Sequence, residues 1–304
     1  MISARGLTKH YGRTTAVDSL SFDVLPGRVT GFLGPNGAGK STTIRMILGL
    51  DAPTRGSVTV GGRRYRDHYR PLHEVGAVLE ARALHPGRSA YHHLLCLAQS
   101  NGIPQRRVDE VLDLVGIAGA ARRRAGAFSL GMSQRLGLAS ALLGDPPVII
   151  CDEPVNGLDP EGIRWIRTLL RGLAAEGRTV FVSSHLMSEM ALTADHVIVV
   201  GRGRLLADTS IQELLRTNAR STTLVRTPDP AALTDLISER GGSVRPDDDD
   251  VTALVISDMS TSEIGELAAR HGLTLHELTP RQPSLESAFL DLTSESVDFR
   301  ANRS

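Results

Sequence analysis

The segment that most constrains the fold runs from Gly34 to Thr42 and reads Gly-Pro-Asn-Gly-Ala-Gly-Lys-Ser-Thr. It satisfies the pattern G-x-x-x-x-G-K-[ST] in a chain of 304 residues that contains only two lysines, of which Lys40 is one. The apolar residues 29–33 before it predict a strand, and apolar residues at helical spacing after it predict a helix over 40–50. The glycines therefore lie at a strand-to-helix turn, where an α/β protein binds phosphate.

The residue types in this loop suit an anion and a metal ion. Glycines let consecutive backbone N–H groups converge on a phosphate without a Cβ in the way, and the helix amino end adds partial positive charge. Lys40 supplies a full charge, and the Ser41 hydroxyl is suited to Mg²⁺, which prefers oxygen ligands. The candidate ligands are Gly34, Pro35, Asn36, Gly37, Ala38, Gly39, Lys40, Ser41 and Thr42.

Length, charge and cysteine content limit what else the chain can be. With 41% hydrophobic residues, 304 residues can bury one large core and a small second one, which predicts two domains. The formal net charge is zero, which gives nucleic acid or anionic lipid no compositional support as a partner.

Cys151 lies in an apolar run and predicts a buried free thiol in a reducing compartment. No run approaches the ~20 apolar residues of a membrane span and no signal peptide is apparent, so we expect a soluble protein that needs a partner for any membrane role.

The order of strand and helix patterns predicts an α/β fold. Strand-like segments at 2–7, 19–24 and 57–60 predict an antiparallel β layer. The following segments are predicted as strand 74–79, helices 91–99, 106–115 and 133–143, strand 148–151, helix 163–175, strand 179–183 and helix 186–194. Short strands separated by helices favour a covered, mostly parallel sheet, with the helices between residues 91 and 143 forming a helical subdomain.

A second segment with phosphate chemistry is the apolar strand 148–151, which is followed directly by Asp152 and Glu153. The carboxyl edge of a buried parallel strand lies beside the crevice where open α/β sheets bind ligands. We expect Asp152 to hold Mg²⁺ through water and Glu153 to align or deprotonate an attacking water. Taken alone, the two acids could simply cap the strand end. Their combination with the phosphate loop favours the chemical role.

Between these segments the chain reads Phe-Ser-Leu-Gly-Met-Ser-Gln-Arg from Phe128 to Arg135. This segment aligns with the signature that separates ABC ATPases from other P-loop ATPases, and residues 2 to about 215 resemble the nucleotide-binding subunits of ABC transporters. The resemblance implies a P-loop NTPase fold and Mg²⁺-dependent ATP hydrolysis. It also implies that Ser129 and Gly131 contact the γ-phosphate of ATP held by the opposite subunit, so that two ATP molecules are sandwiched in a homodimer.

Three further elements follow the family order. Tyr11 matches the aromatic position that stacks on adenine, although a surface tyrosine at a strand end would look the same. Asp159, in the loop 156–160, matches the loop that couples the two sites of the dimer, and it can also cap the helix that follows. His185, after strand 179–183, matches the switch histidine that contacts the γ-phosphate. The resemblance thus assigns catalysis to Lys40, Glu153 and His185.

The chain departs from the family pattern at Glu80, where the family usually has Gln. A carboxylate here adds negative charge beside the two acids at the strand end and would strengthen Mg²⁺ binding. The surrounding residues 79–86 resemble the variant found in drug-exporter subunits, and we expect Glu80 to stay functional at the nucleotide site. The signature also departs, with Leu130 and Met132 in place of the usual Gly and Gln.

After about residue 215 a second unit is predicted, so that the domains are 1–215 and 216–304. Strands near 222–226, 244, 251–257 and 274–277 and helices at 231–240 and 260–271 give the order β-α-β-β-α-β of a ferredoxin-like, small α+β domain. The acidic run 247–250 is predicted to be a solvated hairpin loop with no metal site. A final helix is predicted at 283–290. The role of this domain, structural or regulatory, stays open.

The pattern as a whole predicts a cytoplasmic ATPase subunit on the inner face of the cell membrane, bound to a separate integral membrane permease. The resemblance is to exporters of the ABC-2, daunorubicin- and bacitracin-resistance-like type. It implies ATP and Mg²⁺ as cofactors and a small drug or antibiotic as the cargo. No nucleic acid is expected as a partner. The alternative is an ABC-type ATPase that transports nothing and acts as a regulatory or assembly factor. A nucleotide kinase built on the same phosphate loop is a poorer interpretation, because the chain contains the ABC signature segment.

Overall fold

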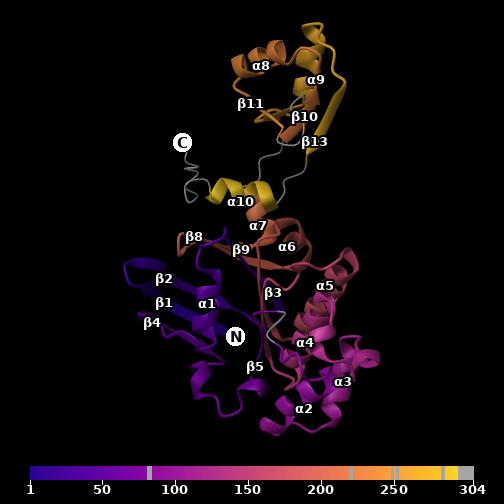
Figure 1. Cartoon of the computed structure of the whole chain (residues 1–304). Coiled ribbons are helices and arrows are strands. Elements are labelled where there is room, and N and C mark those ends of the chain that lie inside the picture. The colour runs from indigo at the N-terminus through magenta and orange to yellow at the C-terminus, as the bar shows by residue number, and fades with distance from the viewer. Residues whose placement is uncertain (81–83, 219–221, 248–249, 251–252, 282–284, 294–304) are drawn as a thin grey trace. The chain divides into compact units, whose positions relative to one another are not determined.

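A computed structural model describes residues 1–80, 84–218, 222–247, 250, 253–281 and 285–293 (Figure 1). The chain divides into two compact units, Met1–Ile211 and Gln212–Leu292. The sequence-predicted residues 81–83, 251–252 and 283–284 lie outside the described part of the chain.

The first unit begins with a three-stranded antiparallel sheet of order β2-β1-β4, made of β1 (Ile2–Tyr11), β2 (Thr14–Val24) and β4 (Arg55–Val60). This confirms the predicted antiparallel layer. The strands extend beyond the predicted segments because polar residues near their ends still pair across the ladder, as Tyr11 does with Thr14.

The second sheet of this unit has six strands in the order β5-β6-β7-β3-β8-β9. The strands are β3 (Arg28–Leu33), β5 (Val75–Val78), β6 (Val148–Asp152), β7 (Thr179–Ser184), β8 (His196–Gly201) and β9 (Arg204–Ser210). The pairs among β5, β6, β7, β3 and β8 are parallel, and β9 runs antiparallel to β8. The mostly parallel sheet is thus confirmed, whereas the sequence pattern identified neither β8 nor β9.

Helices connect the parallel strands, as expected from the alternating pattern. They are α1 (Lys40–Ile47), α2 (Ala90–Ser100), α3 (Arg106–Leu114), α4 (Leu130–Leu142), α5 (Pro160–Ala175) and α6 (Met187–Thr193). Short 3-10 turns lie at Tyr65–Asp67, Pro71–His73, Ala118–Ala120 and Ala125–Ala127. Figure 1 shows α2, α3 and α4 grouped together, which forms the predicted helical subdomain. Helix α1 ends earlier than predicted because Gly49 turns left-handed at φ +67°.

Three phenylalanines join the two sheets. Phe32 of β3 and Phe181 of β7 have ring centroids 5.1 Å apart, and Phe22 of β2 lies 5.8 Å from Phe32 and 5.9 Å from Phe181. All three side chains are buried in one apolar cluster with residues of α1 and β6. Since β3, β6 and β7 share this core, the ends of these strands are held in a fixed relation to one another.

The second unit is an α+β domain, as predicted. It contains β10 (Thr222–Arg226), β11 (Ser243–Pro246), β12 (Ala253–Ser257) and β13 (Glu277–Arg281), with α8 (Pro230–Glu239), α9 (Thr261–Arg270) and α10 (Leu285–Thr293); α7 (Ile211–Asn218) leads into it. The sheet is antiparallel with order β11-β12-β10-β13. Helices α8 and α9 pack Leu233, Ile237 and Ile264 against Val225 and Ile256 of the sheet.

The acidic run between β11 and β12 differs from its prediction. The Asp247 side chain is only 4% exposed and pairs with Arg281 of β13, while Asp250 lies 2.8 Å from Arg226 of β10. The prediction of a solvated loop is therefore wrong at these two positions. Arginines on neighbouring strands draw the acids back onto the sheet, and the local sequence carries no sign of this.

Candidate functional site

The ends of three parallel strands bring the predicted site segments to one edge of the sheet. Leu33 at the end of β3 pairs with Ser184 of β7, and Asp152 at the end of β6 pairs with Ser183. The phosphate loop follows β3, the two acids end β6, and His185 follows β7. Segments that are far apart in the sequence thus meet where an open α/β sheet binds its ligand.

The phosphate loop has a backbone that only glycine adopts without strain. Gly37 has φ +81° and Gly39 has φ +98°, both in the left-handed region. Gly39 is the N-cap of α1, and a Cβ on it would lie 2.4 Å from the carbonyl oxygen of Ala16. Glycine is therefore required at this position both for its conformation and for the close approach of β2.

Lys40 is buried at the head of α1, with 7% of its side chain exposed. Its Nζ donates to the carbonyl oxygens of Gly34 at 2.6 Å and Pro35 at 3.3 Å, and lies 4.0 Å from Oε1 of Glu153. Burial lowers the pKa of Lys40, and the negative charges of Glu153 and Asp152 oppose that shift. The ammonium group thus lies between its own loop and the acids of β6.

Glu153 is held from three sides. Its backbone has φ +51°, which is uncommon for a residue with a side chain, and its N–H donates to Ser183 Oγ at 2.9 Å. Nδ1 of His185 lies 2.8 Å from Glu153 Oε2, and the His185 N–H donates to the same oxygen at 3.3 Å. One carboxylate oxygen therefore faces Lys40 and the other faces His185.

Ser183 is a site residue that the sequence analysis did not assign. Its hydroxyl donates to Asp152 Oδ1 and accepts the Glu153 N–H, so it links both acids. The side chain is fully buried in β7. A hydroxyl that directly follows the apolar residues 180–182, two residues before His185, was the available signal.

Glu80 shares an open depression with the acids of β6. The depression has a volume of about 390 Å³ and is lined by Leu79, Glu80, Leu130, Gln134, Asp152, Glu153, Asn156 and Gly157. Glu80 is exposed at its rim. The carboxylate that replaces the usual Gln is therefore placed at the same opening as Asp152 and Glu153, while Gln134 is a further polar residue that the sequence analysis did not assign.

The signature segment and the loop before α5 form a second group. Ser129 caps α4, since its Oγ accepts the Met132 N–H at 3.3 Å, and Asp159 caps α5 by accepting the Gly162 N–H at 2.8 Å. Both line a depression of about 430 Å³ together with Gly131, Arg135 and Trp165, among others. Lys40, Asp152, Glu153 and His185 are not among its lining residues.

Tyr11 lies at the end of β1 and is 49% exposed. Its hydroxyl donates to Oδ2 of Asp51 at 2.9 Å, which raises the pKa of Tyr11, and the same oxygen accepts from Nε of Arg45 at 2.8 Å. Asp51, which follows α1, was not singled out by the sequence analysis. It ties the predicted adenine-stacking residue to the end of the phosphate-loop helix.

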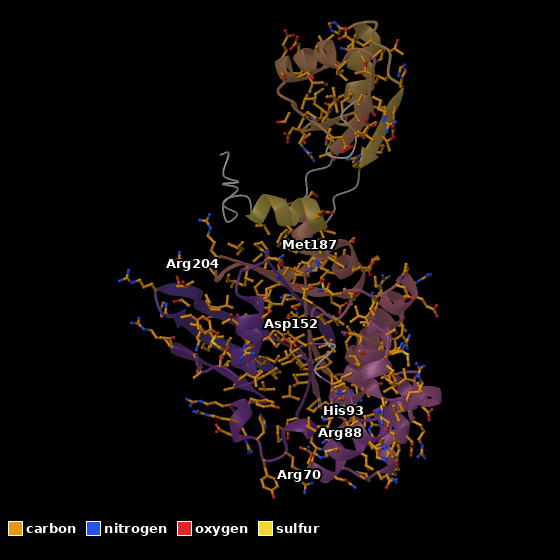
Figure 2. All side chains as sticks on the ribbon, in the orientation of Figure 1. Arg70, Arg88, His93, Asp152, Met187 and Arg204 are labelled. Carbon is orange, nitrogen blue, oxygen red and sulfur yellow. The ribbon has the colours of Figure 1, made fainter. Side chains whose placement is uncertain are left out.

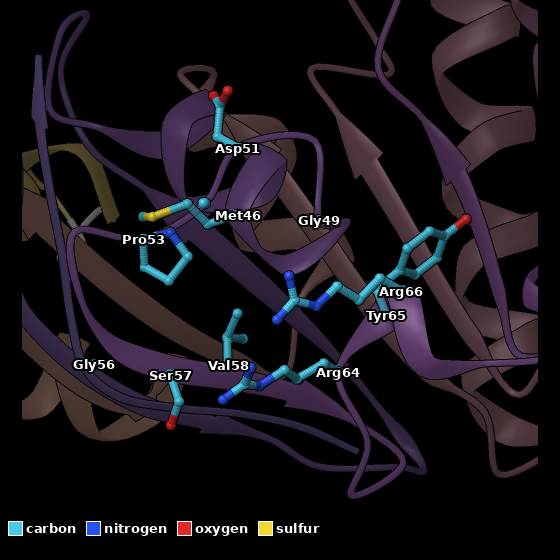
Figure 3. Close-up of a pocket in the computed structure, with 11 residues that line it drawn as sticks. Met46, Gly49, Asp51, Pro53, Gly56, Ser57, Val58, Arg64, Tyr65 and Arg66 are labelled. Atoms are coloured by element: carbon cyan, nitrogen blue, oxygen red, sulfur yellow. The ribbon is translucent and has the colours of Figure 1, made fainter.

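A further pocket lies between the end of α1, β4 and the turn that carries Arg64, Tyr65 and Arg66 (Figure 3). Its volume is about 280 Å³. None of the sequence-predicted site residues lines it, although Asp51 does. The residues predicted to bind or hydrolyse the nucleotide therefore lie outside this pocket.

Comparison with known proteins places these features in a family. A family model described as "ABC transporter" matches residues 17–156, and a domain family of unknown function matches residues 221–286. An uncharacterized ABC transporter ATP-binding protein of Bacillus subtilis is 37% identical over 98% of this chain and 97% of its own length. A bacitracin transport ATP-binding protein of Enterococcus faecalis is 35% identical over 96% of both chains, and one of Bacillus licheniformis is 42% identical over 72% of this chain and 73% of its own.

Solved structures agree with the sequence relatives. An ATP-binding subunit of an ABC transporter has a TM-score of 0.65 and 27% identity, and covers 71% of this chain and 92% of that one. A dimeric bacterial ABC transporter cassette has a TM-score of 0.64 and 26% identity, and covers 69% of this chain and 99% of that one. Within the part of the chain that the structure describes, no helix is long and apolar enough to cross a membrane. The predicted resemblance is confirmed: the chain belongs to the ATP-binding subunits of ABC transporters and is an ATPase of the ABC type.

Proposed function

We propose that this subunit binds ATP with Mg²⁺ at the edge formed by β3, β6 and β7, dimerises on ATP, and energises export of an antibiotic-like small molecule through a separate membrane permease. The observation that carries the proposal is the position of Glu153 between Lys40 and His185. A base, a phosphate-binding cation and a γ-phosphate sensor belong at one place in an ATPase.

The phosphates are held by the loop 34–42 in this proposal. An incoming phosphate replaces the carbonyl oxygens of Gly34 and Pro35 as the partner of the Lys40 ammonium group. Mg²⁺ fits the donors present, because the exposed Ser41 hydroxyl and the Asp152 carboxylate are the hard oxygen ligands that it prefers. A Mg²⁺ ion held by Ser41 and Asp152 would supply positive charge to offset the negative charge of the phosphates, while Lys40 and the loop amides position them.

Glu153 acts as the general base or as the residue that aligns water. Its carboxylate is held by His185 and its backbone N–H by Ser183, so it does not need to reorganise during the reaction. His185 reports the γ-phosphate to Glu153 through the contact between Nδ1 and Oε2. Glu80, at the mouth of the same depression, adds charge beside the metal site.

The second group of residues acts on the nucleotide of another copy. Ser129, Gly131 and Asp159 line a depression apart from Lys40 and Glu153, which supports their use on an opposite subunit. A related solved cassette is dimeric, which also supports this arrangement. Tyr11, fixed by Asp51, supplies the aromatic surface for adenine.

The transported molecule and the location are inferred from relatives. Two of the similar proteins are named for bacitracin transport and one of Streptococcus pyogenes for lantibiotic transport. We infer a peptide-antibiotic-like cargo, export as the direction, and a place on the inner face of the cell membrane. Residues 216–304 act as an accessory domain in this scheme.

The test is to purify the tagged protein from membranes of its own cells in mild detergent and identify what co-purifies in stoichiometric amount. A polytopic membrane protein is expected, and untagged cells provide the control. Ribosomal or DNA-bound partners in its place would contradict transport and leave the ATPase chemistry intact. Cells lacking the subunit should also become more sensitive to peptide antibiotics, and the Glu153→Gln protein should not restore resistance.

A further inference from the structure

The phosphate loop packs against the hairpin that β8 and β9 form. These strands pair Gly201 with Arg204, so Arg202 and Gly203 make up a two-residue turn between them. Arg202 has φ +49° and Gly203 has φ +78°, as in the type I′ turns that commonly join such strands. A hairpin turn is usually exposed, but Gly203 is buried. It lies between the phosphate loop on one side and β2 on the other.

Two backbone hydrogen bonds of Gly203 connect the turn to these neighbours. Its N–H donates to the carbonyl oxygen of Ala38, within the phosphate loop, at 3.1 Å. Its own carbonyl oxygen accepts the N–H of Asp18, in β2, at 2.9 Å. Arg204 reinforces the second link, because its Nη2 lies 2.8 Å from Oδ2 of Asp18. The turn is therefore anchored to β2 and holds one carbonyl group of the phosphate loop.

The turn has no room for a side chain. A Cβ on Gly203 would lie 2.8 Å from the carbonyl oxygen of Ala16 and 3.0 Å from Cα of Val17, and both of these atoms belong to the backbone of β2. The same Ala16 oxygen would lie 2.4 Å from a Cβ on Gly39. Because backbone cannot move aside as a flexible side chain can, a Cβ on Gly203 has to displace the turn from β2 and from the loop that it holds.

The hydrogen bond to Ala38 fixes the direction of the next amide group. The peptide unit between Ala38 and Gly39 is trans, so its C=O and N–H point in opposite directions and the Gly39 N–H points away from the turn. Among the residues that the structure describes, no group accepts this N–H. A hydrogen bond accepted by the carbonyl oxygen also polarises the peptide unit, which makes its N–H a stronger donor.

We propose that Gly203 is a positioning residue of the nucleotide site, which orients the peptide unit between Ala38 and Gly39 so that the Gly39 N–H donates to a phosphate group. The inference rests on the proposed function, in which the loop 34–42 holds the phosphates, and adds a residue that none of the site motifs contains. Figure 2 shows Arg204, the residue after Gly203, well apart from Asp152. The turn therefore acts on phosphate binding and does not touch the acids of β6.

The test compares Gly203→Ala with Gly27→Ala in the full-length protein. Gly27 lies in the turn between β2 and β3 and has the same φ of +78°, but a Cβ on it would meet nothing within 4 Å. Both alanines therefore impose the same backbone strain, and only Gly203→Ala also displaces a turn. ATP hydrolysis at varied ATP concentration and equilibrium binding of ATP and of ADP are the measurements.

Gly203→Ala is expected to raise KM for ATP, and Kd for both ATP and ADP, about tenfold, because one hydrogen bond to a charged group is misdirected. Turnover at saturating ATP should stay within about twofold of wild type, since an interaction made equally in the ground state and in the transition state changes KM and not kcat. A merely structural defect would do the reverse, because a smaller folded fraction lowers the apparent kcat and leaves KM unchanged. Gly27→Ala should keep KM within about twofold of wild type.

A milder variant keeps the inference testable if Gly203→Ala does not fold. Asp18→Ala combined with Arg204→Ala removes the ion pair that anchors the turn, and it should raise KM for ATP roughly two- to threefold. The matched control is Arg5→Ala combined with Asp23→Ala, which removes an ion pair of the same length, 2.8 Å, between β1 and β2. This control should leave KM unchanged.

The outcomes separate this inference from the proposed function. Wild-type protein that binds ATP and ADP, with folded Gly203→Ala binding them equally well, would overturn the inference alone. An equal rise of KM in Gly27→Ala, or a lower kcat with unchanged KM in Gly203→Ala, would also overturn it. If Gly203→Ala does not fold, an anchor variant that matches its control would overturn it in the same way. Wild-type protein that binds neither nucleotide would overturn the proposed nucleotide site and this inference together.

Discussion

At the scale of single residues, the site is organised around the backbone of Glu153. A residue with a side chain at φ +51° is strained, at a cost of about 1–3 kcal/mol. The strain is tolerated because Ser183 accepts the Glu153 N–H and His185 contacts its carboxylate. A rigid carboxylate at a strand end is what a preorganised base requires.

Glu153→Gln is expected to separate binding from hydrolysis. The amide keeps the size and shape of the side chain but cannot accept the proton of the attacking water, so ATP turnover should fall about 100- to 10,000-fold. Nucleotide affinity should stay within a few-fold of wild type. Phosphate release and equilibrium nucleotide binding are the measurements, with Glu239→Gln as a control at an exposed acid of the second unit. Substantial remaining turnover would count against Glu153 as the base.

The two cysteines should react very differently with a thiol reagent. Cys151 is fully buried in β6, and burial raises the pKa of its thiol to about 12, whereas Cys96 is exposed on α2. Because the thiolate is the reactive form, a raised pKa and lack of access both suppress Cys151. A colorimetric thiol assay at mildly alkaline pH should count one fast thiol in the native protein and two after denaturation. Cys96→Ser should remove the fast reaction, and two fast native thiols would contradict the structure.

At the scale of elements, the start of α4 packs directly on the loop before α5. A Cβ on Gly157, which has φ +71°, would lie only 2.2 Å from Cδ2 of Leu130, and a Cβ on Gly131 would lie 3.5 Å from Cδ2 of Leu158. Leu130 stands where the family usually has Gly, so this chain fills the space over the loop before α5 with a side chain. The two predicted segments therefore form one packed group within a single subunit.

Gly157→Ala should disturb this group. The left-handed backbone and the contact with Leu130 should together lower stability by about 1–2 kcal/mol and lower ATP turnover several-fold. Adding Leu130→Ala removes the contact but not the backbone strain, so recovery should be partial. Gly172→Ala is the control. Its Cβ meets nothing within 4 Å on the exposed face of α5, and the substitution should raise the free energy of unfolding by about 0.5–1 kcal/mol. Urea unfolding and phosphate release measure both effects, and equal behaviour of the two alanines would refute the packing argument.

At the scale of the whole molecule, the proposed site residues fall into two separate groups. Lys40 and Glu153 lie at the edge of the central sheet, while Ser129 and Asp159 line a different depression. In the proposed dimer each nucleotide uses one half-site from each copy. Activity per subunit should then rise with protein concentration.

Mixing two inactive variants provides a sharper test of the composite site. Lys40→Ala and Ser129→Arg should each abolish turnover alone. In a mixed dimer one site combines both defects and the other is intact, so the mixture should regain about a quarter of wild-type turnover if pairing is random. The single tryptophan, Trp165, lies in the Ser129 depression and reports dimer formation by its fluorescence. A mixture that stays inactive although dimers form would refute the shared site.

Much of the fold followed from local pattern, and the failures have physical reasons. The strand 148–151 and the phosphate loop carry strong periodic and motif signals. The strands β8 and β9 were not identified: the apolar run 197–200 is as long as the run 148–151, but no motif follows it. Asp51 and Ser183 were not assigned because their importance lies in partners that are 40 and 31 residues away in the sequence. Asp247 was predicted to be solvated because its partner, Arg281, lies far away in the sequence.

The sequence by itself determined which chemistry this chain can perform, because a motif of glycines, lysine and hydroxyl residues between a strand and a helix already specifies a phosphate site. The tertiary structure alone decided which distant residues act together. The parallel register set by the core of Phe22, Phe32 and Phe181 brings Ser183 and His185 to Glu153, and an isolated β-bridge joins Ser89 to Arg124. Periodicity along the chain encodes how each element buries its own face, whereas register between elements arises only when those faces pack against one another.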